Sequence, residues 1–338
     1  MIDLKKEILS ILKKRKWDIK EWSRAVKIEQ WALEQLITQD FSTITEKKQL
    51  DFINDVYIRT KNAKKNTKLM RFSQPVIILL WAHKGGTGKT TTAINFSYEL
   101  SSRGYNTLAI DTDSQCDMTS VLYPEFLNSP DKSFFYAFSM FKDFKKDDYI
   151  CHTDYKNLDI VPGSTRSDGL ERILSNYPED MKNKWWNSAL STVMNDNYYD
   201  FIIIDEDRFA GLLNMSILSI ADYVLVPLEP PIFSVKSFPI ILSNIEEMKK
   251  ENAKLELLGM IFNKVDMRMK RKFTDSLEII EELAPGKVFK NYINMDANID
   301  SSQREFVPLG YYSTKSIANK QMVKLTDEIL ERVKERRM

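Results

Sequence analysis

Apolar residues recur along the chain with two different periods, and the change between them falls near residue 75. Before it, apolar positions three or four residues apart are typical of amphipathic helices. Such helices are expected over residues 2–16, as two short helices within 19–37, and over 46–60. Residues 61–74 carry lysines without periodicity and are followed by Pro75. We therefore predict a small all-α domain over residues 1–60, a basic linker over 61–74, and a second domain over 75–338.

Beyond residue 75, short β-branched apolar runs alternate with helical segments. The expected strands cover 76–82, 107–111, 158–161, 201–205, 223–227, 257–263 and 288–293. The expected helices between and after them cover 90–103, 168–175, 184–194, 238–250 and 273–283. Several strands are apolar at consecutive positions, as strands buried on both faces are. The alternation predicts an α/β fold with a mostly parallel, doubly wound sheet and helices on both of its faces.

Composition narrows the class of protein. The 338 residues are 43% hydrophobic and 29% charged, which is ordinary for a globular chain. The apolar run 76–82 has seven residues, whereas a membrane span needs about 20, so no transmembrane segment is expected. Two cysteines cannot form a disulfide framework, and two histidines leave little material for a histidine metal site. A reducing cytoplasm is the expected location.

Charge is divided unevenly along the chain. Residues 1–72 hold 17 Lys and Arg against 10 Asp and Glu, whereas the remainder holds 32 against 38. A basic N-terminal module on an acidic body is typical of a protein that faces nucleic acid or an acidic partner. A lysine-rich, solvated helical surface would give the same count.

Glycine is scarce, with 10 residues, and clusters once, in Lys84-Gly85-Gly86-Thr87-Gly88-Lys89-Thr90-Thr91. This run lies between a predicted strand and a predicted helix, which is the context of a phosphate-binding loop. Residues without Cβ let backbone N–H groups wrap a polyphosphate, and the following helix directs its positive dipole end at the same anion. Lys89 would add a charge near the β and γ phosphates, and Thr90 would offer a hydroxyl to Mg²⁺.

Polar residues at the ends of other strands fit the same chemistry. Asp111 and Asp113 follow the second strand two positions apart, so we expect both to point towards the loop. There they would suit Mg²⁺ ligation and orientation of an attacking water, although a solvated turn has the same composition. Asp205 ends an apolar strand in the Walker B form, whose carboxylate holds Mg²⁺. Asn263 ends a further strand and could read a purine edge or simply form a turn.

In their order and spacing, these pieces resemble the ParA family of partition ATPases, within the MinD/ParA group, over residues 75–333. The loop has His83 in place of the usual first glycine and a second lysine, Lys84, so it is similar to the deviant Walker A box. The other matching pieces are Asp111-x-Asp113-x-Gln115 with Thr119, the stretch 158–164, Asp205 with Gly211, and the stretch 221–227.

The resemblance implies an ATPase that uses ATP and Mg²⁺. It gives Lys84 a contact with the partner's nucleotide in an ATP-sandwich homodimer, and Lys89 a contact with phosphate. It makes Asp113 the residue that orients water. The remaining implied roles are phosphate binding for Gly85, Gly86, Thr87, Gly88 and Thr91, Mg²⁺ binding for Thr90, Asp111 and Asp205, and adenine contact for Asn263.

The sequence departs from the family pattern at two places. Glu206-Asp207-Arg208 replaces a residue followed by two prolines, and Ser114-Gln115-Cys116-Asp117 replaces Pro-Gln-Gly-Asn. Extra carboxylates near a γ-phosphate weaken anion binding at close range. We therefore expect slow basal turnover.

The N-terminal module fits a helix-turn-helix template over residues 19–37. Leu33 and Leu36 fall at inward positions, but Lys27 stands where the turn favours glycine. The second helix would enter the major groove, with Lys20, Arg24 and Lys27 as the DNA-binding candidates. The alternative is a helical dimerisation or docking domain.

The ATPase body carries a second group of DNA-binding candidates just after Asn263. These are Arg268, Lys270, Arg271 and Lys272, which lie near Lys264. The family uses basic residues around this place for non-specific DNA binding, which depends steeply on salt. Solvated surface charge is the alternative. The last helix, about 322–337, is also basic but has no aromatic residue and four acids, so no membrane docking is expected.

The resemblance thus implies an ATP-dependent ATPase for plasmid or chromosome partition. ATP would drive a homodimer that binds DNA, and a ParB-like centromere-binding partner would stimulate hydrolysis. The protein would be cytoplasmic, and nucleoid-associated when ATP-bound. The alternatives are an ATP-switched transcriptional regulator or anti-activator, and a MinD-like membrane-cycling ATPase.

Overall fold

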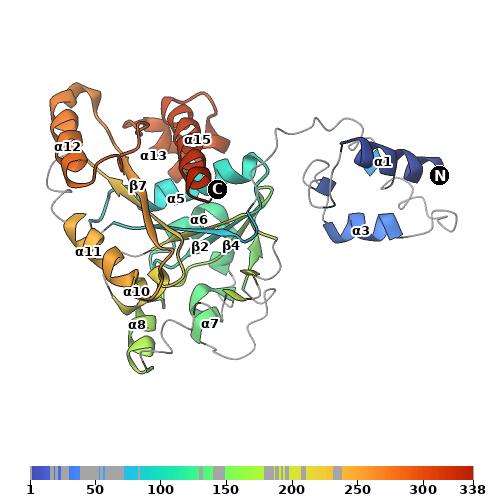
Figure 1. Cartoon of the computed structure of the whole chain (residues 1–338), viewed down its shortest axis with the longest axis horizontal. Helices are drawn as coiled ribbons and strands as arrows, with labels where there is room; N and C mark the ends of the chain where they lie inside the picture. The colour runs from blue at the N-terminus through green and yellow to red at the C-terminus, as the bar shows by residue number, and fades with distance from the viewer. Residues whose placement is uncertain are drawn as a thin grey trace. The chain divides into compact units, whose positions relative to one another are not determined.

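The structure is a computed structural model in which the chain divides into two compact units, Met1–Met70 and Arg71–Met338 (Figure 1). It describes residues 2–15, 19, 22–23, 30–38, 53, 56–57, 72–82, 84–128, 132–139, 149–178, 186, 190–191, 193–194, 198–206, 211–230 and 238–337. In the described part of the chain, no helix is long and apolar enough to cross a membrane.

The first unit contains helices α1 (Ile2–Arg15) and α3 (Gln30–Thr38), together with helical residues at 53, 56 and 57. Its buried residues form one small core, made of Ile8, Leu12, Trp22, Leu33, Leu36, Ile53 and Val56. Trp22 is fully buried there, as expected of a core tryptophan. The proposed turn of the helix-turn-helix lies outside the described residues, so that module stays a prediction.

The second unit is built on a seven-stranded sheet with the order β3-β4-β2-β5-β1-β6-β7. Its strands are β1 (Val76–Leu80), β2 (Thr107–Asp111), β3 (Cys151–His152), β4 (Leu158–Val161), β5 (Phe201–Asp205), β6 (Tyr223–Leu228) and β7 (Glu256–Phe262). All neighbours are parallel except β3 and β4, which are antiparallel. The predicted α/β fold with a mostly parallel sheet is confirmed, and the short edge strand β3 was not foreseen.

Helices cover both faces of this sheet, so its strands are buried on both sides. They are α5 (Lys89–Ser102), α6 (Asp117–Leu122), α7 (Phe134–Ser139), α8 (Asp168–Ser175), α10 (Leu212–Leu218), α11 (Phe238–Met248), α12 (Lys270–Leu283), α13 (Ala297–Arg304), α14 (Leu309–Tyr312) and α15 (Ile317–Arg337). Figure 1 shows α5, α6 and α15 on one side and α8, α10 and α11 on the other. All five residues of β1 and of β5 are buried, which matches their uninterrupted apolar sequences.

The register of the central strands brings the ends that carry the motifs together. Leu80 at the end of β1 and Asp111 at the end of β2 both pair with Asp205 at the end of β5. The phosphate loop, the Asp111 box and the Walker B acid therefore share the carboxyl edge of the sheet, where ligands bind in open α/β folds.

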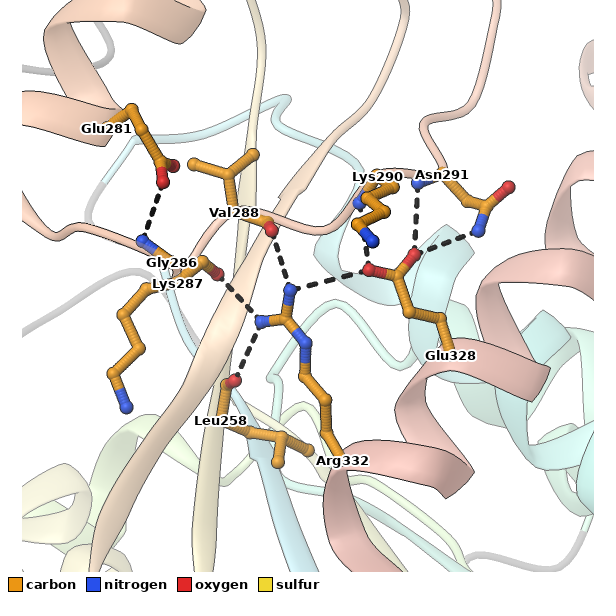
Figure 2. Close-up of polar contacts among 9 residues, drawn as sticks. All are labelled: Leu258, Glu281, Gly286, Lys287, Val288, Lys290, Asn291, Glu328 and Arg332. Atoms are coloured by element: carbon orange, nitrogen blue, oxygen red, sulfur yellow. Dashed lines mark hydrogen bonds and ion pairs between the residues drawn. The ribbon is translucent and has the colours of Figure 1, made fainter. Parts of the chain in front are cut away.

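The strand predicted over 288–293 is wrong. Only isolated bridges join this stretch to the β7 region, from Val288 to Met260 and from Asn294 to Val265. Side chains of α15 form hydrogen bonds with backbone groups of this stretch that a continuous strand would use for pairing (Figure 2). Arg332 donates to the carbonyls of Lys287 and Val288, and Glu328 accepts from the N–H groups of 290 and 291.

Candidate nucleotide-binding site

The phosphate loop follows β1 and ends where α5 begins at Lys89. Gly86 and Gly88 have φ angles of 82° and 83°, in the left-handed region that glycine adopts without strain. At Gly88 there is a second requirement, because a Cβ would lie 2.9 Å from Nδ2 of Asn263. Both the backbone conformation and the close approach therefore explain this glycine.

Asn263, just beyond β7, holds the loop in place by hydrogen bonds. Its buried amide nitrogen donates to the carbonyl of Thr87 at 3.1 Å and to Oγ1 of Thr92 at 2.9 Å. This fixes the loop against the start of α5. The predicted contact with adenine stays a prediction, since the amide nitrogen is occupied by the loop in this structure.

Lys89, Thr90 and Asp205 come together beside the loop. The buried Nζ of Lys89 donates to the backbone carbonyl of Glu206, directly after the Walker B acid. Burial raises the pKa of Asp205 to about 6, against the opposing effects of Lys89 and the Thr90 hydroxyl. Within the part of the chain that the structure describes, the carboxylate oxygens Oδ1 and Oδ2 of Asp205 accept no hydrogen bond of normal geometry. A cation placed here would find an enclosed carboxylate with acceptor capacity to spare.

The side chains of Asp111, at the end of β2, and of Asp113, just after it, point to different places. Asp113 lines the cavity beside the loop, whereas Asp111 does not. Asp111 accepts from N and Oγ1 of Thr119, at 2.9 and 2.6 Å, and so anchors the start of α6. Burial, and then the charge of Asp205, raise its pKa to about 8. The expectation that both point to the loop holds for Asp113 alone, and the Asp111 role in Mg²⁺ binding stays a prediction.

A cavity of about 430 Å³ opens next to the loop, within the size range of small-molecule sites. The loop residues 84–91 line one end, with Asp113, Asp117, Ser120, Val121, Asn263 and Lys264 beside them. A further part of the lining, the C-terminal wall, is largely apolar and consists of Ile293, Ile299, Asp300, Gln303, Phe306, Leu309 and Met322. The cavity therefore offers phosphate-binding groups and apolar side chains to the same ligand.

The C-terminal wall was not foreseen from the sequence, because none of its residues belongs to a motif. Gln303 joins it to the loop by donating from Nε2 to Oγ1 of Thr91 at 2.8 Å. The N–H of Leu309 donates to Oδ1 of Asn95 on α5 at 2.7 Å. These two bonds hold the wall against the phosphate-binding helix.

The residues at this site suit a magnesium ion that is bound jointly by protein side chains and by a phosphate ligand. Among the described residues, no group of three or more His, Cys, Asp and Glu side chains could hold a metal on its own. Magnesium in phosphate sites is bound by one or two protein groups together with phosphate oxygens and water. Thr90 and Asp205 offer that pair.

Two departures from the family pattern have visible structural consequences. Cys116 replaces a glycine and adopts a φ of 55° at the N-terminal cap of α6, a conformation that costs a non-glycine residue energy. Burial, with the nearby Asp111 and Asp113, raises the pKa of its thiol to about 12. The Glu206 side chain is fully buried beside the Walker B acid. Asp207 and Arg208 lie outside the described residues.

The DNA-binding candidates on the ATPase body lie at the beginning of α12. Arg268 and the three basic residues 270–272 are exposed, and 270–272 form the first turn of that helix. Cations at a helix N-terminus oppose the helix dipole, so these basic residues do not stabilise α12. The candidates of the first unit, Lys20, Arg24 and Lys27, lie outside the described residues.

The basic residues at the end of α15 serve internal contacts. The Arg332 guanidinium donates to the carbonyls of Leu258, Lys287 and Val288 (Figure 2). Arg336 pairs with Glu256, and Arg337 pairs with Asp222 at 2.6 Å. These contacts favour a structural role for the helix over DNA or membrane docking.

A parallel sheet, a glycine loop before a helix and a Walker B acid at the same sheet edge define the P-loop class of nucleotide-binding folds. A family model described as an AAA domain (AAA_31) matches residues 76–257. A protein of Methanocaldococcus jannaschii described as uncharacterized is 32% identical over 77% of this chain and all of its own length. The sporulation initiation inhibitor protein Soj of Bacillus subtilis is 26% identical over 75% of this chain and 97% of its own length.

The chain belongs to this AAA-domain family, and its relatives include proteins named ParA and Soj, as the resemblance predicted. The chromosome partitioning protein ParA of Caulobacter vibrioides is 24% identical over 78% of this chain and 97% of its own length. Solved structures show the same fold. Apo McdA of Cyanothece has a TM-score of 0.64 at 19% identity, covering 75% of this chain and 99% of its own. A putative plasmid partition protein of Borrelia burgdorferi bound to AMPPNP has a TM-score of 0.60 at 22% identity, covering 78% and 99%.

Proposed function

We propose that this protein is an ATP-dependent partition ATPase for plasmid or chromosome segregation. The observation that carries the proposal is the loop at 84–91, clamped by Asn263 and facing Asp205 at one sheet edge, in a chain of the ParA group. The cavity beside it combines the lysines, glycines and threonines of the loop, which suit a triphosphate, with the apolar side chains that a nucleoside needs. Related folds bound to AMPPNP, or to an ATP analogue and magnesium, support ATP and Mg²⁺ as the ligands.

The proposed chemistry is phosphoryl transfer to water, which proceeds mainly by positioning and electrostatic stabilisation. Lys89 and the loop N–H groups hold the phosphates, and Thr90 and Asp205 would hold Mg²⁺, which neutralises developing charge. Asp113, the carboxylate of its pair that reaches the cavity, orients the attacking water. Asp117 and Glu206 place further carboxylates near the phosphate-binding residues, which makes basal turnover slow. A ParB-like partner that binds centromere DNA would stimulate hydrolysis.

Dimerisation and DNA binding complete the proposed cycle. Lys84 is exposed at the entrance of the loop, where it could contact the nucleotide of a second copy. The ATP-bound homodimer would bind DNA non-specifically through the exposed basic residues at 268–272. Its location would be the cytoplasm, with nucleoid association in the ATP state. The inward contacts of the α15 arginines speak against a membrane-cycling alternative.

The test compares Lys89→Ala and Lys84→Ala with the wild-type chain and with Lys249→Ala, a lysine paired to Glu246 on the surface. ATP–Mg²⁺ affinity is measured by calorimetry, mass by sedimentation, and binding to random duplex DNA by fluorescence anisotropy. Lys89→Ala should lose ATP binding and DNA binding. Lys84→Ala should keep ATP affinity but stay monomeric, while Lys249→Ala behaves as wild type. ATP and DNA binding that are unchanged in Lys89→Ala would refute the proposal.

A further inference from the structure

The basic loop, defined here as Lys264, Arg268, Lys270, Arg271 and Lys272, contains a single acid, Asp266. That acid contacts one residue of the loop, the arginine that the proposed function uses for DNA. Oδ1 of Asp266 accepts from Nε of Arg268 at 2.9 Å, and Oδ2 accepts from Nη2 at 2.7 Å. The pair therefore has the two-point geometry in which carboxylates bind guanidinium groups most strongly.

Asp266 is held in place independently of this ion pair. The N–H of Val265 donates to the carbonyl of Ile293 at 3.0 Å, and the N–H of Met295 donates to the carbonyl of Val265 at 3.1 Å. Oδ1 of Asp266 also accepts from the backbone N–H of Arg268 at 3.0 Å, which caps the short 3-10 turn Met267–Met269. The carboxylate is thus fixed at the base of the loop, and the long Arg268 side chain folds back onto it.

The two partners differ in exposure. The Arg268 side chain is 85% exposed and the Asp266 side chain 16% exposed, so DNA could reach the guanidinium while the carboxylate stays behind it. The hydrogen bonds from Arg268 lower the pKa of Asp266, which keeps the carboxylate charged. A phosphate approaching Arg268 would meet a guanidinium whose charge is already balanced and whose neighbour repels it.

We propose that Asp266 is a built-in competitor of DNA phosphate for Arg268, which lowers the affinity of the basic loop for DNA and keeps the complex easily reversible. This inference rests on the proposed DNA-binding function. For a protein that must leave DNA after each ATP cycle, moderate affinity favours fast release.

Asp266→Asn separates the two contacts of this side chain. The amide oxygen still accepts from the Arg268 N–H, so the turn is kept, but the negative charge is gone. Glu282→Gln is the control, because it removes one acidic charge from an exposed position at the opposite end of α12 from the basic loop. Arg268→Ala and the double variant Asp266→Asn/Arg268→Ala complete a cycle. Binding of the full-length chain to a fluorescent random duplex with ATP and Mg²⁺ is measured across a salt series.

We expect Asp266→Asn to bind the duplex about threefold more tightly than wild type, the effect of removing one like charge roughly 6 Å from a phosphate in water. The slope of log K against log salt should steepen by about 0.9, the value for one additional phosphate contact. Glu282→Gln should show no steeper slope, and the gain should vanish in the Arg268→Ala background.

If the Asp266→Asn variant binds the duplex as tightly as wild type or more weakly, the inference is overturned and the proposed function stays intact. Weakened binding would mean that the carboxylate positions Arg268 for DNA. If neither wild type nor Asp266→Asn binds duplex with ATP, the proposed function fails and this inference fails with it.

Discussion

Replacing Arg332 by Met should strongly destabilise the second unit. The guanidinium is only 16% exposed and donates to three carbonyls, those of Leu258 at 3.2 Å, Lys287 at 3.0 Å and Val288 at 2.6 Å. It also lies over the Phe289 ring, 3.9 Å from the centroid. Figure 2 shows that these carbonyls come from both β7 and the segment that runs along it. Arg332 therefore joins α15 to this edge of the sheet.

The expected loss can be estimated from these contacts. A hydrogen bond from a charged group contributes about 1.5–3 kcal/mol, and a buried acceptor left unpaired costs about 1–3 kcal/mol. The carbonyl of Lys287 keeps a second donor, the N–H of Met260. Glu328 keeps its bonds to the Lys290 and Asn291 N–H groups, so its charge is not left bare. Methionine also retains apolar contact with the ring. We expect a net loss of about 2–4 kcal/mol.

The assay is chemical denaturation of the full-length chain, followed by tryptophan fluorescence, to which the buried Trp81 and Trp186 of the second unit contribute alongside Trp22 of the first. Lys334→Met is the control, since this exposed residue lies on the same helix and should change stability by less than about 0.5 kcal/mol. Gly259→Ala should also be costly, because its Cβ would lie 2.5 Å from both Nη1 of Arg332 and the carbonyl oxygen of Lys287, and 2.6 Å from the Phe289 ring. A loss below about 1 kcal/mol for Arg332→Met would refute the structural role of the guanidinium.

Three further predictions concern the site and its surroundings. Gly88→Ala should weaken ATP binding, measured by calorimetry, far more than Gly86→Ala. A methyl group at Gly88 would meet Asn263, whereas nothing lies within 4 Å of a methyl group at Gly86. Equal losses of affinity would contradict this. Cys116 should be alkylated at pH 8 on the order of a thousand times more slowly than a free thiol, since a pKa of about 12 leaves almost no thiolate; mass spectrometry showing reaction at the free-thiol rate would exclude this. At Asp296, burial alone would raise the pKa, but hydrogen bonds to its carboxylate outweigh it and the folded-state pKa is lowered. A lowered folded-state pKa gives stability that is present above the ordinary carboxyl pKa of about 4 and lost as the pH falls through the folded-state value. Wild type should therefore exceed Asp296→Asn in thermal stability at pH 6 by a margin that narrows towards pH 3, and a margin constant with pH would count against it.

Most of the fold was predictable because its strands leave a strong signal in the sequence. β1 and β5 are buried on both faces, so their apolar residues run without interruption and end at turn residues. β3 has two residues, too few to produce a periodic pattern. The stretch 288–293 has the composition of a strand, but its backbone is partly bound by α15 side chains about 40 residues later. Such competition depends on tertiary contacts that local sequence does not contain.

The site shows the same division between what backbone geometry requires and what packing supplies. A phosphate loop needs particular residue types at fixed spacing, because Gly86 and Gly88 adopt left-handed backbone and Lys89 must carry charge. The C-terminal wall needs only volume and a shape that many side chains provide. Gln303 reaches Thr91, 212 residues earlier in the chain, because Asp296 caps α13 at 2.9 Å and α14 is bonded to α5. Sequence reasoning therefore finds the half of the cavity that binds phosphate, where backbone conformation dictates residue type. The half that would receive the base is specified by the packing of the C-terminal helices, and its residues become recognisable only once α13 is placed beside α5.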